Sequence, residues 1–204
     1  METIPTTAII VKAVEDAISY ADFRIKVMNL ALKGATTGPN QTESLIEYTR
    51  LNDRRMKRWD KTFNIPNEEK LIIHSFAKKV TWLVITEGWC GDAAHILPVL
   101  NAVANENKNI SLKVILRDEH EALMDMFLTN GSKAIPKLIV LDENNEVLIS
   151  WGPRPSAATV MVKDYKEKHG ALTAEFKEEL QLWYNKDKGK TILKDILKLL
   201  ISLK

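Results

Sequence analysis

The sequence predicts an α/β fold in which a central mixed sheet has helices on both faces. A short, β-branched, apolar run at residues 80–87 is typical of a strand buried in the middle of a sheet. A helical pattern follows to about residue 105, and a second strand is predicted at residues 110–118. Residues 136–152 favour a hairpin whose turn is DENN. This order indicates a parallel strand–helix–strand unit followed by an antiparallel pair.

Two helical segments are predicted before this unit. Apolar residues recur every three or four positions over residues 6–33, where Thr6 or Thr7 can cap the helix and Gly34 can end it. After the loop GATTGPN, a second helix is predicted at residues 42–61. The residues expected to be buried are Ile10, Val14, Ala17, Ala21, Ile25, Met28 and Leu32 in the first helix, and Leu45, Tyr48, Leu51, Met56 and Trp59 in the second.

The second helix also carries a basic stripe on its other face. Cations at helical spacing are usual on a solvated helix surface, which is the favoured interpretation. The alternative is a docking surface for an anionic group near the thiol described below. The stripe consists of Arg50, Arg54, Lys57, Arg58 and Lys61.

Four more helices are predicted around and after the strands. Asn67 can cap a short helix, and residues 119–131 favour a helix that ends at an Asn-Gly pair. Residues 157–185 are predicted to be helical with a break at Gly170. Residues 191–204 give an amphipathic terminal helix.

We therefore expect three regions. Residues 1–66 form an N-terminal helical region, residues 67–170 the α/β domain, and residues 171–204 a C-terminal helical extension that packs on the core. The alternative for the terminal helix is to lie on a membrane surface, but its apolar stripe is short and no lipidation signal accompanies it. That stripe consists of Ile192, Ile196, Leu200 and Leu203.

Composition and charge exclude several classes of protein. Hydrophobic residues make up 45% of the chain and charged residues 27%, as in soluble globular proteins. The formal net charge is +2, which offers no general case for a nucleic-acid partner. Neither a secretory signal nor a membrane span is predicted. We therefore expect a protein of the reducing cytoplasm with no nucleic-acid or membrane partner.

The single cysteine, Cys90, stands in the stretch TEGWCGDAAHILP, where a strand is predicted to end and a helix to begin. The free N–H groups and the positive dipole end of a helix favour a thiolate and lower its pKa. Two glycines, Trp89 and Asp92 surround the cysteine, so we expect an exposed thiol. The alternative is a buried, inert cysteine. One cysteine also excludes an intramolecular disulfide.

The segment WCGDAAHILPVL resembles the active-site segment of thioredoxins. The usual form there is Trp-Cys-Gly-Pro-Cys, with a proline eight residues after the first cysteine, and Pro98 lies eight residues after Cys90. Thioredoxin-fold proteins also carry a cis-proline opposite the thiol, and the stretch KAIPKLIV supplies Pro136 with Ile135 before it. Gly152, after the predicted hairpin, also fits the pattern.

The resemblance covers residues 80–169, about half of the chain, and it is specific because the motif, both prolines and the order of elements agree. It implies a thioredoxin-like fold with added helices at both ends. It is closest to a bacterial branch of thioredoxin-like proteins that has a Trp-Cys-Gly-Asp core. It also implies a cis peptide bond between Ile135 and Pro136, where backbone groups would hold an extended substrate chain.

Three departures from the thioredoxin pattern change the expected mechanism. Ala93 replaces the second, resolving cysteine, so the chain cannot release a captured partner by forming an internal disulfide. Val84 replaces the buried acid that accepts the proton of the second cysteine in thioredoxins. Asp92 replaces the usual proline, and its carboxylate suits a helix N-terminus but raises the pKa of a neighbouring thiol.

Other polar residues are candidates near the thiol. Glu87, Arg117 and Asp118 follow the two parallel strands, at the sheet edge where sites form in α/β proteins. The alternative is that they are solvated strand ends. The two alanines after the motif leave a small-residue wall for a flat or thiol-bearing ligand. His95 lies about 140° around the helix from Cys90, which favours a packing role over catalysis.

These observations predict a monothiol mechanism. Cys90 attacks a disulfide or a sulfenic acid of a partner protein, and an external thiol, either a low-molecular-weight thiol or another protein's cysteine, resolves the mixed disulfide. The alternative is a non-catalytic binding or redox-sensing module. One cysteine and four scattered histidines lack the spacing of metal ligands, so neither a metal nor a cofactor is expected. A homo-oligomer is compatible with the sequence. The residues predicted near the thiol are Trp89, Gly91, Asp92, Ala93, Ile135, Pro136, Glu87, Arg117 and Asp118.

Overall fold

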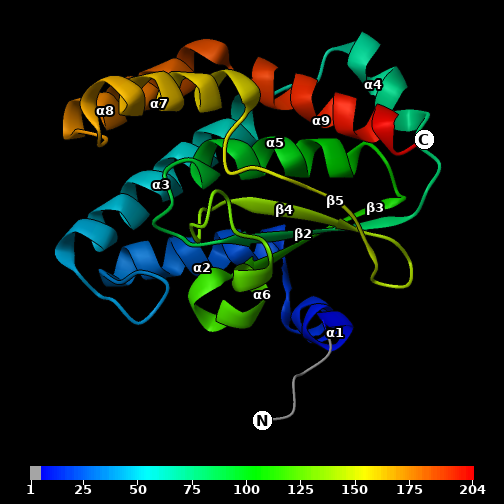
Figure 1. Cartoon of the computed structure of the whole chain (residues 1–204), viewed down its shortest axis with the longest axis horizontal. Coiled ribbons are helices and arrows are strands. Elements are labelled where there is room, and N and C mark those ends of the chain that lie inside the picture. The colour runs from blue at the N-terminus through cyan, green and yellow to red at the C-terminus, as the bar shows by residue number, and fades with distance from the viewer. Residues whose placement is uncertain (1–5) are drawn as a thin grey trace.

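A five-stranded mixed sheet runs through the centre of the computed structural model, which describes residues 6–204 (Figure 1). The strand order is β1-β3-β2-β4-β5. Strands β2 and β3 are parallel, and every other neighbouring pair is antiparallel. The predicted α/β fold with helices on both faces of a mixed sheet is therefore confirmed. The strands are β1 (Ile18–Ser19), β2 (Val80–Thr86), β3 (Ile110–Leu116), β4 (Lys137–Leu141) and β5 (Val147–Trp151).

The central strand β2 positions the site. All its residues except Thr81 are buried, because β3 and β4 flank it and helices cover both faces. In the parallel register Thr86 pairs with Leu116 at the carboxyl ends of the two strands. The chain after β2 and the chain after β3 therefore leave the sheet at one edge, where Glu87 and Arg117 follow.

One face of the sheet is covered by three helices (Figure 1). They are α1 (Thr6–Asp16), α2 (Tyr20–Lys33) and α6 (Glu121–Met126). The prediction of a single helix over residues 6–33 is wrong. After α1 the chain forms the short strand β1, which pairs with β3, and only then does α2 begin. The first five residues of the predicted N-terminal region lie outside the described residues.

The break at β1 changes which residues of α2 are buried. Helix α2 starts in a new phase and buries Tyr20, Phe23 and Val27. The expected core residues Ala21, Ile25, Met28 and Leu32 are exposed instead. A helical period in the sequence does not reveal that two residues in its middle pair with a distant strand.

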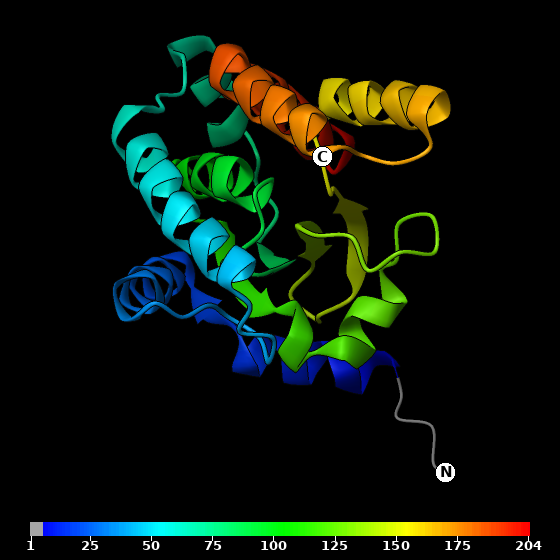
Figure 2. The ribbon, with the colours of Figure 1, turned by 90° about the vertical axis from the view of Figure 1, so that its left-hand side faces the viewer.

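The other face of the sheet is covered by α5 (Ala93–Asn105). Helix α3 (Glu43–Thr62) packs against both α2 and α5 and so closes one end of the sheet (Figure 2). It buries Met56 and Trp59 as expected, but Tyr48 is 39% exposed. The same face buries the polar Thr49 and Asn52 instead, as described below. Leu45 and Leu51 are half-buried.

An outer layer of helices lies over α5 (Figures 1 and 2). Helix α9 contacts α4, α5 and α7, with Ile192, Ile196 and Leu200 fully buried and Leu203 partly buried. The terminal stripe therefore lies against the core. The division into three regions stays a prediction. The helices are α4 (Asn67–His74), α7 (Ser156–His169), α8 (Ala174–Asp187) and α9 (Lys190–Ser202).

Of two further helix predictions, one shows the predicted break and the other is too long. The break at Gly170 is present, with φ at 76°, and separates α7 from α8. The helix expected over residues 119–131 is too long, because a 3-10 turn occupies Arg117–Glu119 and α6 ends at Met126. The chain then makes a tight turn in which Thr129 and Ser132 bond to each other. None of the helices between residues 6 and 204 is long and apolar enough to cross a membrane.

Candidate functional site

The turn between β2 and α5 brings Cys90 against the loop before β4. The backbone N–H of Cys90 donates to the Glu87 carbonyl at 3.1 Å, which sets the turn. The thiol donates to the Ile135 carbonyl oxygen at 3.4 Å, and the Ile135–Pro136 peptide bond is cis. Cys90, Ile135 and Pro136 are therefore neighbours, and all three are buried.

The expected exposure of Cys90 is wrong. Cys90 is only 7% exposed, and this burial raises the pKa of its thiol to about 12. The Asp92 carboxylate raises this pKa further, and the backbone N–H groups of Ala93 and Asp92 only partly oppose the increase. The helix N-terminus acts in the expected direction, but desolvation of the charged thiolate is the larger effect.

Asp92 is held by residues from the C-terminal part of the chain. Its carboxylate forms an ion pair with Arg154, with a separation of 2.8 Å, and accepts a hydrogen bond from the Tyr184 hydroxyl at 2.9 Å. It makes no side-chain bond to the N-terminus of α5. Burial raises the pKa of Asp92, while Arg154 and Tyr184 lower it. The aspartate in the motif thus ties the start of α5 to the segment after β5 and to α8 instead of capping its own helix.

His95 is a buried packing residue. Its Nδ1 accepts from the Trp59 indole N–H at 2.9 Å, and its Nε2 lies 2.8 Å from Gln181 Oε1. Because indole can only donate, Nδ1 is unprotonated and Nε2 carries the hydrogen that is given to Gln181. The ring also stacks on Tyr184, with centroids 4.5 Å apart. Burial lowers the pKa of His95 to about 3, so the ring is neutral at physiological pH.

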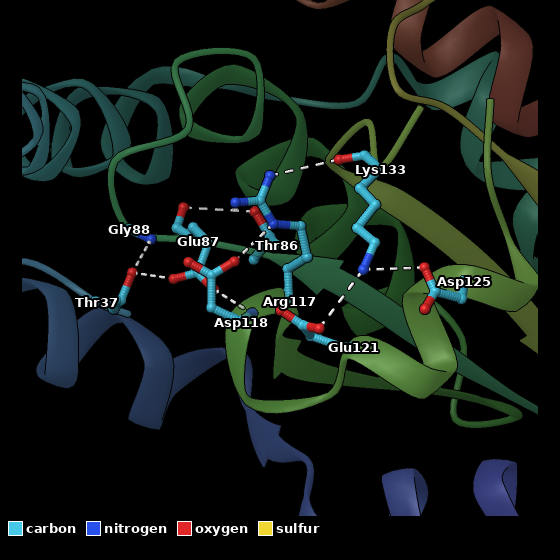
Figure 3. A network of polar contacts seen from close by, with 9 residues as sticks. All are labelled: Thr37, Thr86, Glu87, Gly88, Arg117, Asp118, Glu121, Asp125 and Lys133. Atoms are coloured by element: carbon cyan, nitrogen blue, oxygen red, sulfur yellow. Dashed lines mark hydrogen bonds and ion pairs between the residues drawn. The ribbon is translucent and has the colours of Figure 1, made fainter. Parts of the chain in front are cut away.

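Glu87 anchors the turn from the other side (Figure 3). One carboxylate oxygen accepts from the Thr37 hydroxyl and the other from the backbone N–H of Asp118, at 2.9 Å. The Thr37 oxygen in turn accepts from the backbone N–H of Gly88 at 2.9 Å. Burial raises the pKa of Glu87, and these donors lower it. Glu87 and Asp118 are therefore joined at the sheet edge and are not separate solvated strand ends.

Arg117 lies beside the motif tryptophan. Its guanidinium carbon is 4.9 Å from the centre of the half-buried Trp89 ring, a cation–π distance. It also donates to Asp118 at 2.8 Å and to the Lys133 carbonyl at 3.4 Å (Figure 3). The three polar candidates at the strand ends thus surround the segment that leads into Cys90.

Helix α3 supports the same turn with two polar side chains. Asn52 donates to the Gly88 carbonyl at 3.0 Å and accepts from Arg55 at 3.0 Å. Burial lowers the pKa of Arg55. Arg55 is the α3 cation that lies near Gly91, and it is not part of the predicted basic stripe. The stripe residues Arg50, Arg54, Lys57, Arg58 and Lys61 are exposed.

The predicted small-residue wall is not accessible to a ligand. Ala93 is 2% exposed and Ala94 is 1% exposed, because α3 and the sheet cover the first turn of α5. Gly152 shows another tight contact at this site. Its φ is 110°, and an added Cβ would collide with the Pro136 carbonyl oxygen. Only glycine combines that backbone angle with so close an approach to the proline loop.

Sequence reasoning missed the residues that enclose the motif. Arg154 stands between two prolines in WGPRP, and Tyr184 continues an apolar i, i+4 spacing from Phe176 and Leu180, but neither pattern indicates a polar partner. Thr37 lies in a loop of turn residues. Between residues 6 and 204, no three His, Cys, Asp or Glu side chains are grouped closely enough to hold a metal ion.

We expect Thr37→Val to lower the free energy of unfolding by about 1–2 kcal/mol, because it leaves the buried Gly88 N–H without an acceptor and removes a donor from Glu87. Urea denaturation measures the change. Thr62→Val, at an exposed helix end, is the matched control and should change stability by less than about 0.5 kcal/mol. Equal stabilities of the two variants would contradict a role for Thr37 in holding the turn.

Comparison with known proteins agrees with the thioredoxin-like fold. The model of a family described as Thioredoxin matches residues 38–166 and so includes α3. A protein of unknown function from Pseudomonas aeruginosa, solved at 1.5 Å, has a TM-score of 0.64 and 17% identity, covering 99% of this chain and 100% of that one. An HIV epitope scaffold has a TM-score of 0.62 and 18% identity, covering 95% of this chain and 98% of that one.

At these identities the likeness to the two solved structures concerns the fold alone. None of the curated proteins matches this chain. The family model, by contrast, matches more than half of the chain, and the matched part contains Cys90, Pro136 and all but one strand of the sheet. This chain therefore belongs to the thioredoxin family.

Proposed function

We propose that this chain is a single-thiol thioredoxin-fold protein that carries out thiol–disulfide exchange through Cys90. The observation that supports this most directly is the 3.4 Å contact between the Cys90 sulfur and the Ile135 carbonyl. By resemblance to thioredoxins, backbone groups at this point would hold an extended partner chain. A backbone N–H of the partner could donate to the Ile135 carbonyl in place of the Cys90 thiol. The thiol would then be free to react beside the partner.

The proposed reaction uses one thiol of this chain and one external thiol. The Cys90 thiolate attacks one sulfur of a partner's disulfide, a bond forms to Cys90, and the departing sulfur takes up a proton. With a sulfenic acid, hydroxide leaves and is protonated to water. An external thiolate then attacks the partner's sulfur in the mixed disulfide, forms a new disulfide with it and releases the Cys90 thiolate, which takes up a proton. Such a thiol is abundant in a reducing cytoplasm, where we propose that the protein acts.

Release depends on the external thiol because this chain has no internal one. Ala93 stands where the resolving cysteine would be, and Cys90 is the single cysteine in the sequence. Val84 is fully buried in β2 and has no group to accept a proton. We also infer, from the Trp-Cys-Gly-Asp core, that the chain is part of the bacterial branch that shares this motif.

Burial of the thiol favours a second candidate function. A cysteine that is 7% exposed and has a pKa of about 12 holds almost no thiolate at neutral pH. In that case the chain would be a non-catalytic binding or redox-sensing module. The two functions differ in one requirement, which is that exchange needs a partner able to open the contact between Cys90 and Ile135.

The exchange function makes a direct prediction. Incubation with a labelled peptide disulfide should yield a covalent adduct at Cys90 that persists until a small thiol is added, as followed by mass spectrometry. Ala93→Cys should shorten the lifetime of the adduct by supplying an attacking thiol. The shortening should be smaller than in a two-cysteine thioredoxin, since Val84 accepts no proton.

The controls separate the two candidate functions. Cys90→Ser should form no adduct, which assigns the reaction to this residue. If the folded protein forms no adduct while the urea-unfolded protein does, the thiol is shielded and the binding or sensing module is the correct function. If the folded and the urea-unfolded protein formed the adduct at equal rates, this would instead contradict the burial of the Cys90 thiol against Ile135.

A further inference from the structure

An open groove lies in the outer helical layer, and Cys90 does not line it. It has a volume of 1060 Å³ and runs between α4 and α9, which lie side by side, with the end of α3 closing one end (Figure 1). Its floor is apolar and comes from all three helices. The floor residues are Trp59, Phe63, Ile72, Leu193, Leu197 and Ile201.

The two walls of the groove carry opposite charge. On the α9 wall, Lys190, Lys194 and Lys198 repeat every four residues and form one row along the helix. Glu68 and Glu69 stand on the α4 wall. Two further cations, Arg58 and Lys188, lie at the end near α3 and α8. None of these five cations forms an ion pair with a carboxylate within residues 6–204.

We propose that this groove binds an amphipathic helix of a partner protein, with an acidic flank facing α9 and a basic flank facing α4. A helix laid in a groove buries its apolar face on the floor, and charges at the rim set its direction and register. The lysine row and the two glutamates are complementary to such a helix in one orientation only. Three turns of α9, from Lys190 to Ile201, line the groove over roughly 16 Å, which matches about three turns of a bound helix.

The shape of the groove favours a helix over a small anionic amphiphile. Small-molecule sites are concave and enclose most of the ligand surface. This groove is partly open to solvent, so an acyl chain lying in it would keep part of its surface in water. A helix presents its polar face to solvent at the same place. The pair of glutamates also opposes a purely anionic ligand.

The test uses two designed peptides of roughly 14 residues, about four helical turns, with leucines on one face. One has glutamates on one flank and lysines on the other, and the second has glutamines at all of these flank positions. Fluorescence anisotropy with the full chain measures both dissociation constants. We expect the charged peptide to bind at least tenfold more tightly than the glutamine peptide, and its binding to weaken as salt is added.

Variants of the groove complete the test. The triple substitution Lys190→Glu, Lys194→Glu and Lys198→Glu makes both walls negative, because Glu68 and Glu69 remain on α4, and should remove the advantage of the charged peptide. Ile201→Asn, at a half-exposed floor position, should weaken both. The control Lys166→Glu with Lys168→Glu, on exposed α7, should change neither. Circular dichroism confirms that each variant is folded.

Four results would overturn the proposal. The first is equal affinity for the two peptides, and the second is an unchanged preference in the triple variant. The third is displacement of both peptides by oleate or by anionic phosphatidylglycerol vesicles at lower concentration than by unlabelled peptide, which would identify a lipid site. A concentration-dependent dimer that excludes the peptides would show instead that a second copy of this chain covers the groove, and would equally contradict it.

Discussion

The folded protein should react with iodoacetamide at pH 8 at least about a hundredfold more slowly than an ordinary cysteine. Burial and the nearby Asp92 carboxylate raise the pKa of Cys90 to about 12, against 9.0 for a free thiol. This increase of three pKa units lowers the fraction of thiolate at pH 8 by about a thousandfold. A more basic thiolate is more nucleophilic and regains part of that factor. Burial then slows the reaction again, because the reagent must reach a sulfur that faces the Ile135 carbonyl.

The matched control for this measurement is an exposed cysteine in the same chain. Ala171→Cys in a Cys90→Ser background places a thiol in the loop between α7 and α8, at an exposed position outside any helix N-terminus. It should react at an ordinary rate in the folded protein. In urea, Cys90 of the natural sequence should reach the same rate. Two results would contradict the closed site. One is a reaction rate of Cys90 in the folded protein within threefold of the control, and the other is a midpoint near pH 9 when this rate is plotted against pH. Either would strengthen the case for a thiol that is ready to react.

The neighbours of Cys90 could be predicted from sequence to the extent that local pattern and sheet topology decide them. A strand that ends at Thr86 and a parallel strand that ends at Leu116 place Glu87 and Arg117 at one edge. These two placements need only the order of the elements, which apolar runs and turn residues reveal. The proline before β4 is expected opposite Cys90 from the resemblance to thioredoxins.

The environment of Cys90 could not be predicted, because it depends on contacts distant in sequence. Tyr184 bonds to Asp92 across 92 residues, and Arg154 comes from the segment after β5. A glycine-flanked cysteine beside a tryptophan and an aspartate is typical of an exposed site. Here the distant helices α3 and α8 supply side chains that hold Asp92 and His95. Burial of the motif therefore depends on these helices and not on the motif itself.

The fold shows the same division between local and distant causes. The apolar period of residues 6–33 continues through a strand of two residues, since β1 is specified by its partner β3 and not by its own composition. The polar face of α3 that carries Thr49 and Asn52 was likewise not predictable. Asn52 is buried because the Gly88 carbonyl and Arg55 satisfy its amide.

The second large effect concerns His95 and pH. In the unfolded chain a histidine takes up a proton near pH 6.5, whereas burial lowers the pKa of His95 in the folded protein to about 3. The nearby cations Arg55 and Arg58 on α3 act in the same direction, while the bond to Gln181 opposes it. Between these two pKa values the unfolded state therefore binds one more proton than the folded state. Stability is present in full above pH 6.5 and is lost as pH falls through this window.

We therefore expect the free energy of unfolding to fall by about 2.5 kcal/mol between pH 7 and pH 4.5 through His95 alone. Urea denaturation at the two pH values measures this in the natural sequence and in His95→Gln, which is less stable at pH 7 but cannot titrate. The fall should be about 2.5 kcal/mol smaller in that variant, whereas His169→Gln, at the exposed end of α7, should keep the fall of the natural sequence. If the free energy of unfolding fell by the same amount in His95→Gln, this would show that His95 takes up its proton in the folded protein over this pH range. The bonds from Trp59 and to Gln181 would then not fix the neutral ring.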